Sequence, residues 1–244
     1  MLRRVTSHIN GPGTKPGPWQ HCREMITLSP ERLREIGLRE LRREQTVFAQ
    51  TAAQIDPGKS PIEVFKAIQK DHPAEDSLIS DTTKDLETIR QFLVDHQILT
   101  LPSEVRAQVA ETPQFMRATS FASMDTPGPF ETKATEAYYY VTPTEKDWSP
   151  QQKEEWLTAF NYYTTDVVSI HEAYPGHYVQ FLCLNASPAT RVQKIFASYG
   201  FTEGWAHYAE QMLVDEGFGA SASLTPTRAE QIKAAKYRLA QLDE

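Results

Sequence analysis

The chain has 244 residues, of which 40% are hydrophobic and 23% are charged, and its formal net charge is −7. These fractions are ordinary for a globular protein. The acidic balance argues against a nucleic-acid-binding protein, because such proteins carry a basic face. No apolar run approaches the roughly 18 residues that a membrane-spanning helix needs.

The N-terminus and the cysteines bear on the expected compartment. Arg3 and Arg4 are followed by no apolar stretch, so we expect no signal peptide. Cys22 and Cys183 lie far apart and form no disulfide framework, which favours a reducing compartment. The default expectation is a cytoplasmic protein, although a longer parent protein could be exported.

The first 28 residues differ in composition from the rest. Glycine and proline recur between Gly11 and Pro18, which predicts an irregular segment over 1–28. Residues 29–244 are predicted to form a single helical domain. Ser or Thr followed by Pro marks expected helix starts, because the hydroxyl caps the helix and proline suits its first position. These starts are Ser29-Pro30, Ser60-Pro61, Ser149-Pro150, Ser187-Pro188 and Thr225-Pro226.

Helical spacing of apolar residues follows these starts. Helices are predicted over 30–55, 61–70 and 77–96, and the chain is predicted to be helical again from 150 through 242. The region 103–142 between them differs, because Val105, Ala107 and Val109 alternate and Ala137–Val141 is an aromatic and β-branched run bounded by turn residues. This pattern predicts a short strand or hairpin. The predicted fold class is therefore mainly α, with many helices and a small β-sheet element.

Residues 171–177 read His-Glu-Ala-Tyr-Pro-Gly-His and resemble the H-E-x-x-H signature of zinc peptidases. In that signature two His on one helix face bind zinc while Glu polarises water. Residues four apart differ by about 40° around a helix, whereas residues six apart, as His171 and His177 are, differ by about 120°. An unbroken helix would therefore not let both bind one ion.

Pro175 and Gly176 lie between the two histidines. Proline interrupts helical hydrogen bonding, and glycine tolerates backbone torsions that other residues resist. We therefore expect a bend that returns His177 to the face of His171.

A second group of metal-capable side chains follows on a predicted helix. Glu203 lies 26 positions after His177, which leaves room for a helix, a turn and an antiparallel return. Zinc held by two His and one Glu, with an open fourth position, is a catalytic arrangement. Glu203 shares a stripe with His207 and Glu210, beside a predicted core stripe of Phe201, Trp205, Tyr208 and Met212.

Together, the segments HEAYPGHY and FTEGWAHYAE resemble the bacterial family of HEAxPGH proteins, which is catalogued as a domain of unknown function. That family is grouped with the gluzincin-type zinc peptidases and is distantly similar to the carboxypeptidase Taq and oligopeptidase folds. The resemblance extends to residues 136–142, where the family has a strand ahead of the metal helix. Family members are usually longer, so the chain is expected to be a truncated portion of the family fold.

The resemblance implies a multi-helix, zincin-like fold of the gluzincin type. It also implies that zinc is bound by His171, His177 and Glu203, with Glu172 as the general base.

Three of these assignments have an alternative. Glu210 competes with Glu203 as the third ligand, or orients a ligand His from behind. His207 is expected either near the ligands, in the substrate cleft, or at the surface. Tyr139 is assigned first to sheet packing and second to an edge strand that pairs with substrate backbone.

The predicted function is zinc-dependent hydrolysis of a peptide bond, with metal-activated water and Glu172 as base. One alternative is a catalytically impaired fragment that retains metal and acts as a helical binding module. Another is hydrolysis of an amide or ester in a small metabolite. The expected cofactor is Zn²⁺, and the expected partner is a peptide or small amide substrate rather than a nucleic acid.

Overall fold

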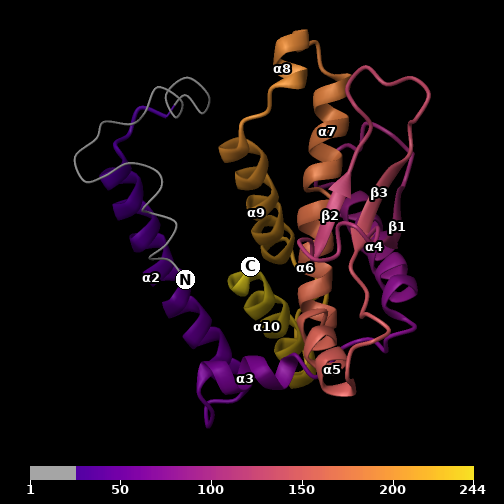
Figure 1. The fold of residues 1–244 in the computed structure, drawn as a ribbon. Helices are drawn as coiled ribbons and strands as arrows, with labels where there is room; N and C mark the ends of the chain where they lie inside the picture. The colour runs from indigo at the N-terminus through magenta and orange to yellow at the C-terminus, as the bar shows by residue number, and fades with distance from the viewer. Residues whose placement is uncertain (1–25) are drawn as a thin grey trace.

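The computed structural model describes residues 26–244, so most of the predicted irregular segment lies outside the described residues. The described part is mainly helical with one small sheet, as predicted (Figure 1). No helix within it combines the length and apolarity needed to cross a bilayer. The helices are α2 (Pro30–Ile55), α3 (Pro61–Ile68), α4 (Leu78–Asp95), α5 (Pro150–Ala159), α6 (Tyr162–Glu172), α7 (His177–Ala186), α8 (Arg191–Ile195), α9 (Tyr199–Asp215) and α10 (Arg228–Asp243). The strands are β1 (Ala107–Glu111), β2 (Ala122–Asp125) and β3 (Ala137–Val141).

The first three predicted helix caps are confirmed. The hydroxyl groups of Ser29, Ser60 and Ser149 accept hydrogen bonds from the backbone N–H three residues later, at the starts of α2, α3 and α5. A proline stands in the first turn of each helix, where its missing N–H would have no helical partner. Local sequence decides these three starts.

The last two predicted caps are wrong. Ser187 ends α7 rather than beginning a helix, and α8 begins only after Thr190. Likewise, α10 begins after Thr227 and not after Thr225. At both observed starts the side-chain oxygen of a Gln or Glu three positions on accepts a hydrogen bond from the backbone N–H of the cap residue. This reciprocal pair satisfies a second backbone donor, which a Ser-Pro start alone does not.

The three strands form one sheet in the order β1-β3-β2. The predicted strand over 137–141 is confirmed as β3, which is parallel to β1 and antiparallel to β2. Because β2 and β3 follow each other in the chain and pair antiparallel, the hairpin alternative is confirmed as well. The edge-strand prediction for Tyr139 is wrong, because β3 is the central strand. The edge strand that contacts α6 is β2, whose sequence Ala-Ser-Met-Asp has little β propensity and was not predicted.

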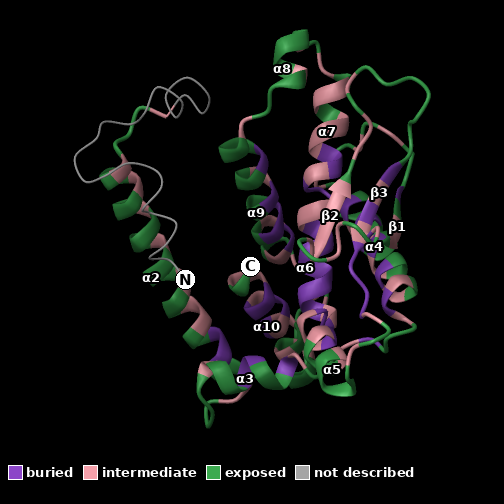
Figure 2. Ribbon diagram, viewed as in Figure 1, coloured by how far each residue is buried: buried purple, intermediate pink, exposed green. Residues whose placement is uncertain are grey.

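Helix α6 lies at the centre of the fold. Residues Tyr163–Ile170 are all buried, and α6 contacts α4, α9, α10 and β2. Figure 2 shows buried residues along α6, whereas α2 is mostly exposed. Helix α7 follows the end of α6, and α9 lies beside both (Figure 1). A helix covered on all sides is a firm support for the residues at its end.

The buried face of α9 differs from the predicted aromatic stripe. Phe201 and Tyr208 are 63% and 57% exposed, so their assignment to the core is wrong. The buried residues of α9 are Thr202, Ala206, Ala209, Glu210 and Leu213. Small side chains at most of these positions let α9 approach α6 and α7 closely, since helix separation depends on the side chains at the contact.

One buried carboxyl group joins α10 to α6. Asp166 is 6% exposed, and its Oδ2 accepts a hydrogen bond of 2.6 Å from the hydroxyl of Tyr237. Burial, together with the nearby charge of Asp85, raises the pKa of Asp166 from its ordinary 3.8 to about 7. The folded chain therefore holds this proton more tightly than the unfolded chain does.

This shift predicts a pH-dependent gain in stability for Asp166→Asn. Because the folded pKa is raised, the native chain loses stability as the pH rises from about 4 to 7, while the variant has no carboxyl group to ionise. Between pH 5 and pH 8, the free energy of unfolding of the native chain should therefore fall by roughly 2 kcal/mol more than that of the variant. Urea unfolding at both pH values measures this gain. Asp76→Asn, at an exposed position, is the control, and an equal change with pH in both variants would contradict the assignment.

Candidate metal centre

Helix α6 ends at the first part of the His-Glu motif. His171 and Glu172 are its last two residues, and the N–H groups of Ala173 and Tyr174 both donate to the carbonyl of Ser169. The Tyr174–Pro175 peptide bond is cis, and α7 then begins at His177. The expected bend between the two histidines is therefore confirmed.

Gly176 is required by the close approach of the backbone at this bend. Its N–H donates to the carbonyl of Ile170 at 2.9 Å. A Cβ atom at position 176 would lie 1.6 Å from the carbonyl oxygen of His171 and 2.3 Å from its carbonyl carbon. Helix α9 fixes the bend from the side, because Trp205 Nε1 donates to the carbonyl of Pro175 at 2.9 Å. No side chain larger than hydrogen fits at position 176.

The bend brings the predicted ligands together. The imidazole rings of His171 and His177 lie 4.7 Å apart between centroids. The Nε2 atom of each lies 3.5 Å from Oε2 of Glu203, which extends from α9. One candidate ligand atom from each of the three residues lies within 4.8 Å of the others. Two helices that meet at a bend and one antiparallel neighbour thus supply the three donors.

Glu210 lies behind His171 and is 1% exposed. Its Oε1 is 2.6 Å from Nδ1 of His171 and 3.1 Å from Nδ1 of His207. This contact keeps a proton on Nδ1 of His171, so that Nε2 is the nitrogen that faces His177 and Glu203. His171, His207 and Glu210 also form a compact group. We favour the group with Glu203, because the carboxylate of Glu210 is already bonded to both imidazoles.

The electrostatics of the two ligand candidates differ. Burial lowers the pKa of His171, but the hydrogen bond and charge of Glu210 outweigh it, so the pKa is raised. Burial, reinforced by the charge of His171, lowers the pKa of His177. Its Nδ1 is buried and has no hydrogen-bond partner among the described residues. His177 therefore favours the neutral form, which is the form that binds metals.

Glu172 lies beside the ligand group without belonging to it. Burial raises its pKa to about 7, and the charge of Glu203 adds to the rise. His171 and a backbone hydrogen bond from Met124 on β2 oppose the rise. A carboxyl group with a pKa near neutrality, next to a metal-capable group, is suited to accept and return a proton.

The remaining predicted residues have clear positions. Tyr139 is fully buried, and its hydroxyl accepts a hydrogen bond of 3.2 Å from Ser169 on α6, so its placement in a substrate cleft is wrong. The side chain of His207 is 52% exposed and lies at the rim, against Glu210. At Gly204 an added Cβ would meet nothing within 4 Å, so sterics do not explain this glycine beside Glu203.

Sequence reasoning missed two contributors to the site. Trp205 was assigned to the core, but its indole N–H holds the bend. Met124 was not singled out, because the signal for β2 is weak. Of the two, only Trp205 has a signal in the sequence, because the indole N–H of a partly buried tryptophan usually donates a hydrogen bond.

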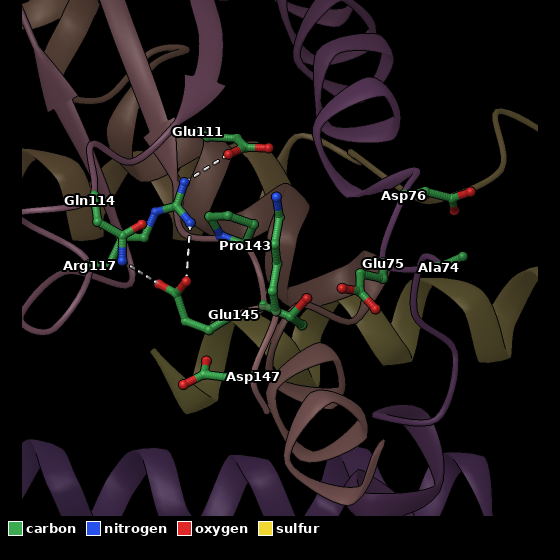
Figure 3. Close-up of a pocket in the computed structure, with 11 residues that line it drawn as sticks. Ala74, Glu75, Asp76, Glu111, Gln114, Arg117, Pro143, Glu145 and Asp147 are labelled. Atoms are coloured by element: carbon green, nitrogen blue, oxygen red, sulfur yellow. Dashed lines mark hydrogen bonds and ion pairs between the residues drawn. The ribbon is translucent and has the colours of Figure 1, made fainter. Parts of the chain in front are cut away.

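A separate hollow of about 970 Å³ is lined by charged residues (Figure 3). Arg117 lies between Glu111 and Glu145, at 2.7 and 3.5 Å, and also donates to the carbonyl of Thr112. Its cation is therefore already paired, and none of the predicted site residues lines this hollow. The metal-capable group between α6, α7 and α9 is the stronger candidate site.

Gly176→Ala should destabilise the fold, because the added methyl group cannot coexist with the carbonyl of His171. We expect a loss of at least about 3 kcal/mol in the free energy of unfolding, which is typical of severe overpacking. Gly37→Ala is the control, since an added Cβ there meets nothing within 4 Å in the exposed middle of α2. The free energy of unfolding of the control should rise by up to about 1 kcal/mol, because alanine favours the helix more than glycine does. Equal effects in urea unfolding would contradict the steric argument.

Solved structures of other proteins share this fold. A protein of unknown function from Shewanella oneidensis, provisionally described as a lipoprotein, aligns with a TM-score of 0.70 and 25% identity over 89% of this chain and 39% of its own. A protein from Colwellia psychrerythraea, described in the same provisional way, aligns with a TM-score of 0.69 and 18% identity over 91% and 36%. The chain thus spans well under half the length of these proteins.

No curated protein matches the sequence. The family model described as "Bacterial protein of unknown function (DUF885)" matches residues 20–242. The expectation of a bacterial family of unknown function is therefore confirmed, and the chain belongs to the DUF885 family.

Proposed function

We propose that the chain is a zinc-dependent peptide hydrolase with a gluzincin-type site on a zincin-like helical fold. One observation carries the proposal. The bend at residues 173–176 places Nε2 of His171 and of His177 at 3.5 Å from the same oxygen of Glu203, with Glu172 beside them. Two imidazoles and one carboxylate are the ligands of many catalytic zinc sites.

The residues fit zinc in chemistry and in exposure. Imidazole nitrogen and carboxylate oxygen are donors that zinc accepts. The buried carboxylate of Glu210 fixes the orientation of His171 through a hydrogen bond, as carboxylates commonly do for zinc-bound histidines. The side chains of His171 and His177 are 17% and 12% exposed, whereas that of Glu203 is 49% exposed. The group therefore opens to solvent on the side of Glu203, where a substrate could enter.

The chain's own residues supply the proton transfers. Zinc, when bound, would lower the pKa of a bound water to about 7 and polarise a carbonyl group. Glu172, whose pKa burial raises to about 7, accepts the proton of the attacking water and passes it to the leaving amine. His207 lies at the rim against Glu210, and its side chain is 52% exposed.

Strand β2 favours an extended peptide over a small metabolite as substrate. Its Met124 gives a backbone hydrogen bond to Glu172, so this outer edge of the sheet lies at the catalytic carboxyl group. An exposed strand edge pairs with extended peptide backbone. Pairing with substrate backbone, the second role assigned to Tyr139, therefore passes to β2.

The ligand assignment predicts a graded loss of zinc affinity. The native chain should bind about one zinc ion. Glu210→Gln should weaken binding roughly 10- to 100-fold, because Glu210 acts through His171. Glu203→Gln should weaken it further, because a ligand is lost. Competition with a chromophoric chelator measures both, with Glu35→Gln on exposed α2 as control. The reverse order would exchange the roles of Glu203 and Glu210, and less than half a zinc per chain would overturn the site.

The role of Glu172 predicts that metal binding and turnover separate. Glu172→Gln keeps the side-chain shape and removes the proton acceptor, so zinc should stay bound while hydrolysis falls at least roughly 100-fold. A mixed peptide library, with and without chelator, is the assay. Turnover retained in the variant would remove Glu172 from its role. Zinc without any peptide or small-amide hydrolysis by the native chain would instead support a metal-retaining binding module.

A further inference from the structure

Buried polar groups without a hydrogen-bond partner gather where α7 meets α9. Over the described residues 26–244, seven buried side-chain nitrogen or oxygen atoms have no such partner. Three of the seven are Nδ1 of His177 and Oε1 of Gln180 on α7, and Oγ1 of Thr202 on α9. Because most buried polar groups in proteins are hydrogen-bonded, this concentration beside the candidate metal centre requires an explanation.

The Nδ1 atom of His177 needs an acceptor when the ring binds zinc. Nε2 is the nitrogen of His177 that faces Glu203, at 3.5 Å from Oε2. A neutral imidazole that binds a metal through Nε2 carries its proton on Nδ1. Zinc-bound histidines almost always donate this proton to a carboxylate, a carbonyl oxygen or water, which fixes the ring. Glu210 accepts from His171 in this way, but within the described part of the chain nothing accepts from His177.

Gln180 has the position and the chemistry of the missing acceptor. It lies three residues after His177 in the first turn of α7, where its N–H donates to the carbonyl of Gly176 at 3.0 Å. Residues three apart on a helix are neighbours, with Cβ atoms about 5–6 Å apart. The Cα–Cβ bond of a helical residue tilts toward the helix N-terminus, so the Gln180 side chain starts in the direction of His177. Its amide oxygen accepts hydrogen bonds and cannot donate them.

Thr202 approaches Gln180 from the neighbouring helix. It directly precedes Glu203 on α9, and it lines the same hollow between α7 and α9 as Gln180, so both side chains border one space. A hydroxyl group donates one hydrogen bond, and an amide oxygen has two lone pairs. Oε1 of Gln180 can therefore accept from Thr202 and from His177 at the same time.

We propose that Gln180 is a positioning residue of the metal centre. In the zinc-loaded chain its Oε1 accepts a hydrogen bond from Nδ1–H of His177 and a second one from the hydroxyl of Thr202. The inference rests on the proposed function, because it concerns a ligand of the proposed zinc site. It gives His177 the support that Glu210 gives to His171, and it leaves none of the three buried groups unpaired.

The zinc affinity of single variants is the first test. Gln180→Met keeps the length of the side chain and removes the acceptor, so it should weaken zinc binding roughly tenfold in competition with a chromophoric chelator. Gln180→Glu keeps an acceptor oxygen and should stay within about threefold of the native affinity. Gln151→Met, at an exposed position on α5, is the control and should not change the affinity.

The outcomes separate this inference from the proposed function. Equal zinc affinities of the native chain and Gln180→Met would overturn the role of Gln180 and leave the zinc site standing. Equal losses in Gln180→Met and Gln180→Glu would indicate a packing effect and would overturn the role as well. Absence of zinc binding by the native chain would overturn the site and the inference together.

A double-mutant cycle tests the link to Thr202. Thr202→Val removes the hydroxyl group and nearly preserves the shape, so it should weaken zinc binding roughly two- to fivefold, because Gln180 loses one of its two donors. In a Gln180→Met background the same substitution should have no further effect, since no acceptor remains for the hydroxyl. Equal losses in both backgrounds would overturn the link.

The ring proton of His177 provides a readout that a merely structural role would not change. In the zinc-loaded chain with ¹⁵N-labelled histidine, the Nδ1–H signal of His177 should exchange slowly with water, and its loss in His177→Gln assigns it. At full zinc occupancy, Gln180→Met should shift this signal and speed its exchange severalfold, while the Nδ1–H signal of His171 stays unchanged. An unchanged His177 signal in Gln180→Met would overturn the proposal, whatever the zinc affinities.

Discussion

The candidate site depends on one close approach of the backbone. The chain passes from α6 to α7 so tightly that the α-carbon of Gly176 faces the carbonyl group of His171 with no room for a side chain. The N–H of Gly176 bonds to the carbonyl of Ile170, so the bend is held by its own hydrogen bond. Without this turn, His171 and His177 would point in directions about 120° apart.

Helix α9 holds the two halves of this bend together. Trp205 bonds to the carbonyl of Pro175, and Glu210 bonds to the imidazole of His171. Both contacts need α9 to lie close to α6, which its buried alanines permit. The buried carboxylate of Glu210 is matched by histidine N–H groups, as a charge in a protein interior must be. The packing of α9 is therefore what lets Glu203 face the histidines.

The sheet contributes to the same end of α6 in a different way. Its central strand is buried against α6, where Tyr139 contacts Ser169, and its edge strand meets Glu172 through the backbone of Met124. The central strand thus supports the helix, and the edge strand lies beside Glu172, the proton acceptor in our proposal.

The sequence by itself determined the helices with strong local signals, the strand over 137–141 and the bend at Pro175-Gly176, because these depend on capping, periodicity and backbone chemistry within a few residues. The grouping of His171, His177 and Glu203 also followed, from spacing and from the resemblance of two motifs. Only the tertiary structure decided the rest. The position of β2, the burial of Tyr139, the exposure of Phe201 and the contact of Glu210 with His171 all depend on which faces of distant segments pack together. Local periodicity shows that a helix has an apolar face, but the volumes of its neighbours decide which face is buried.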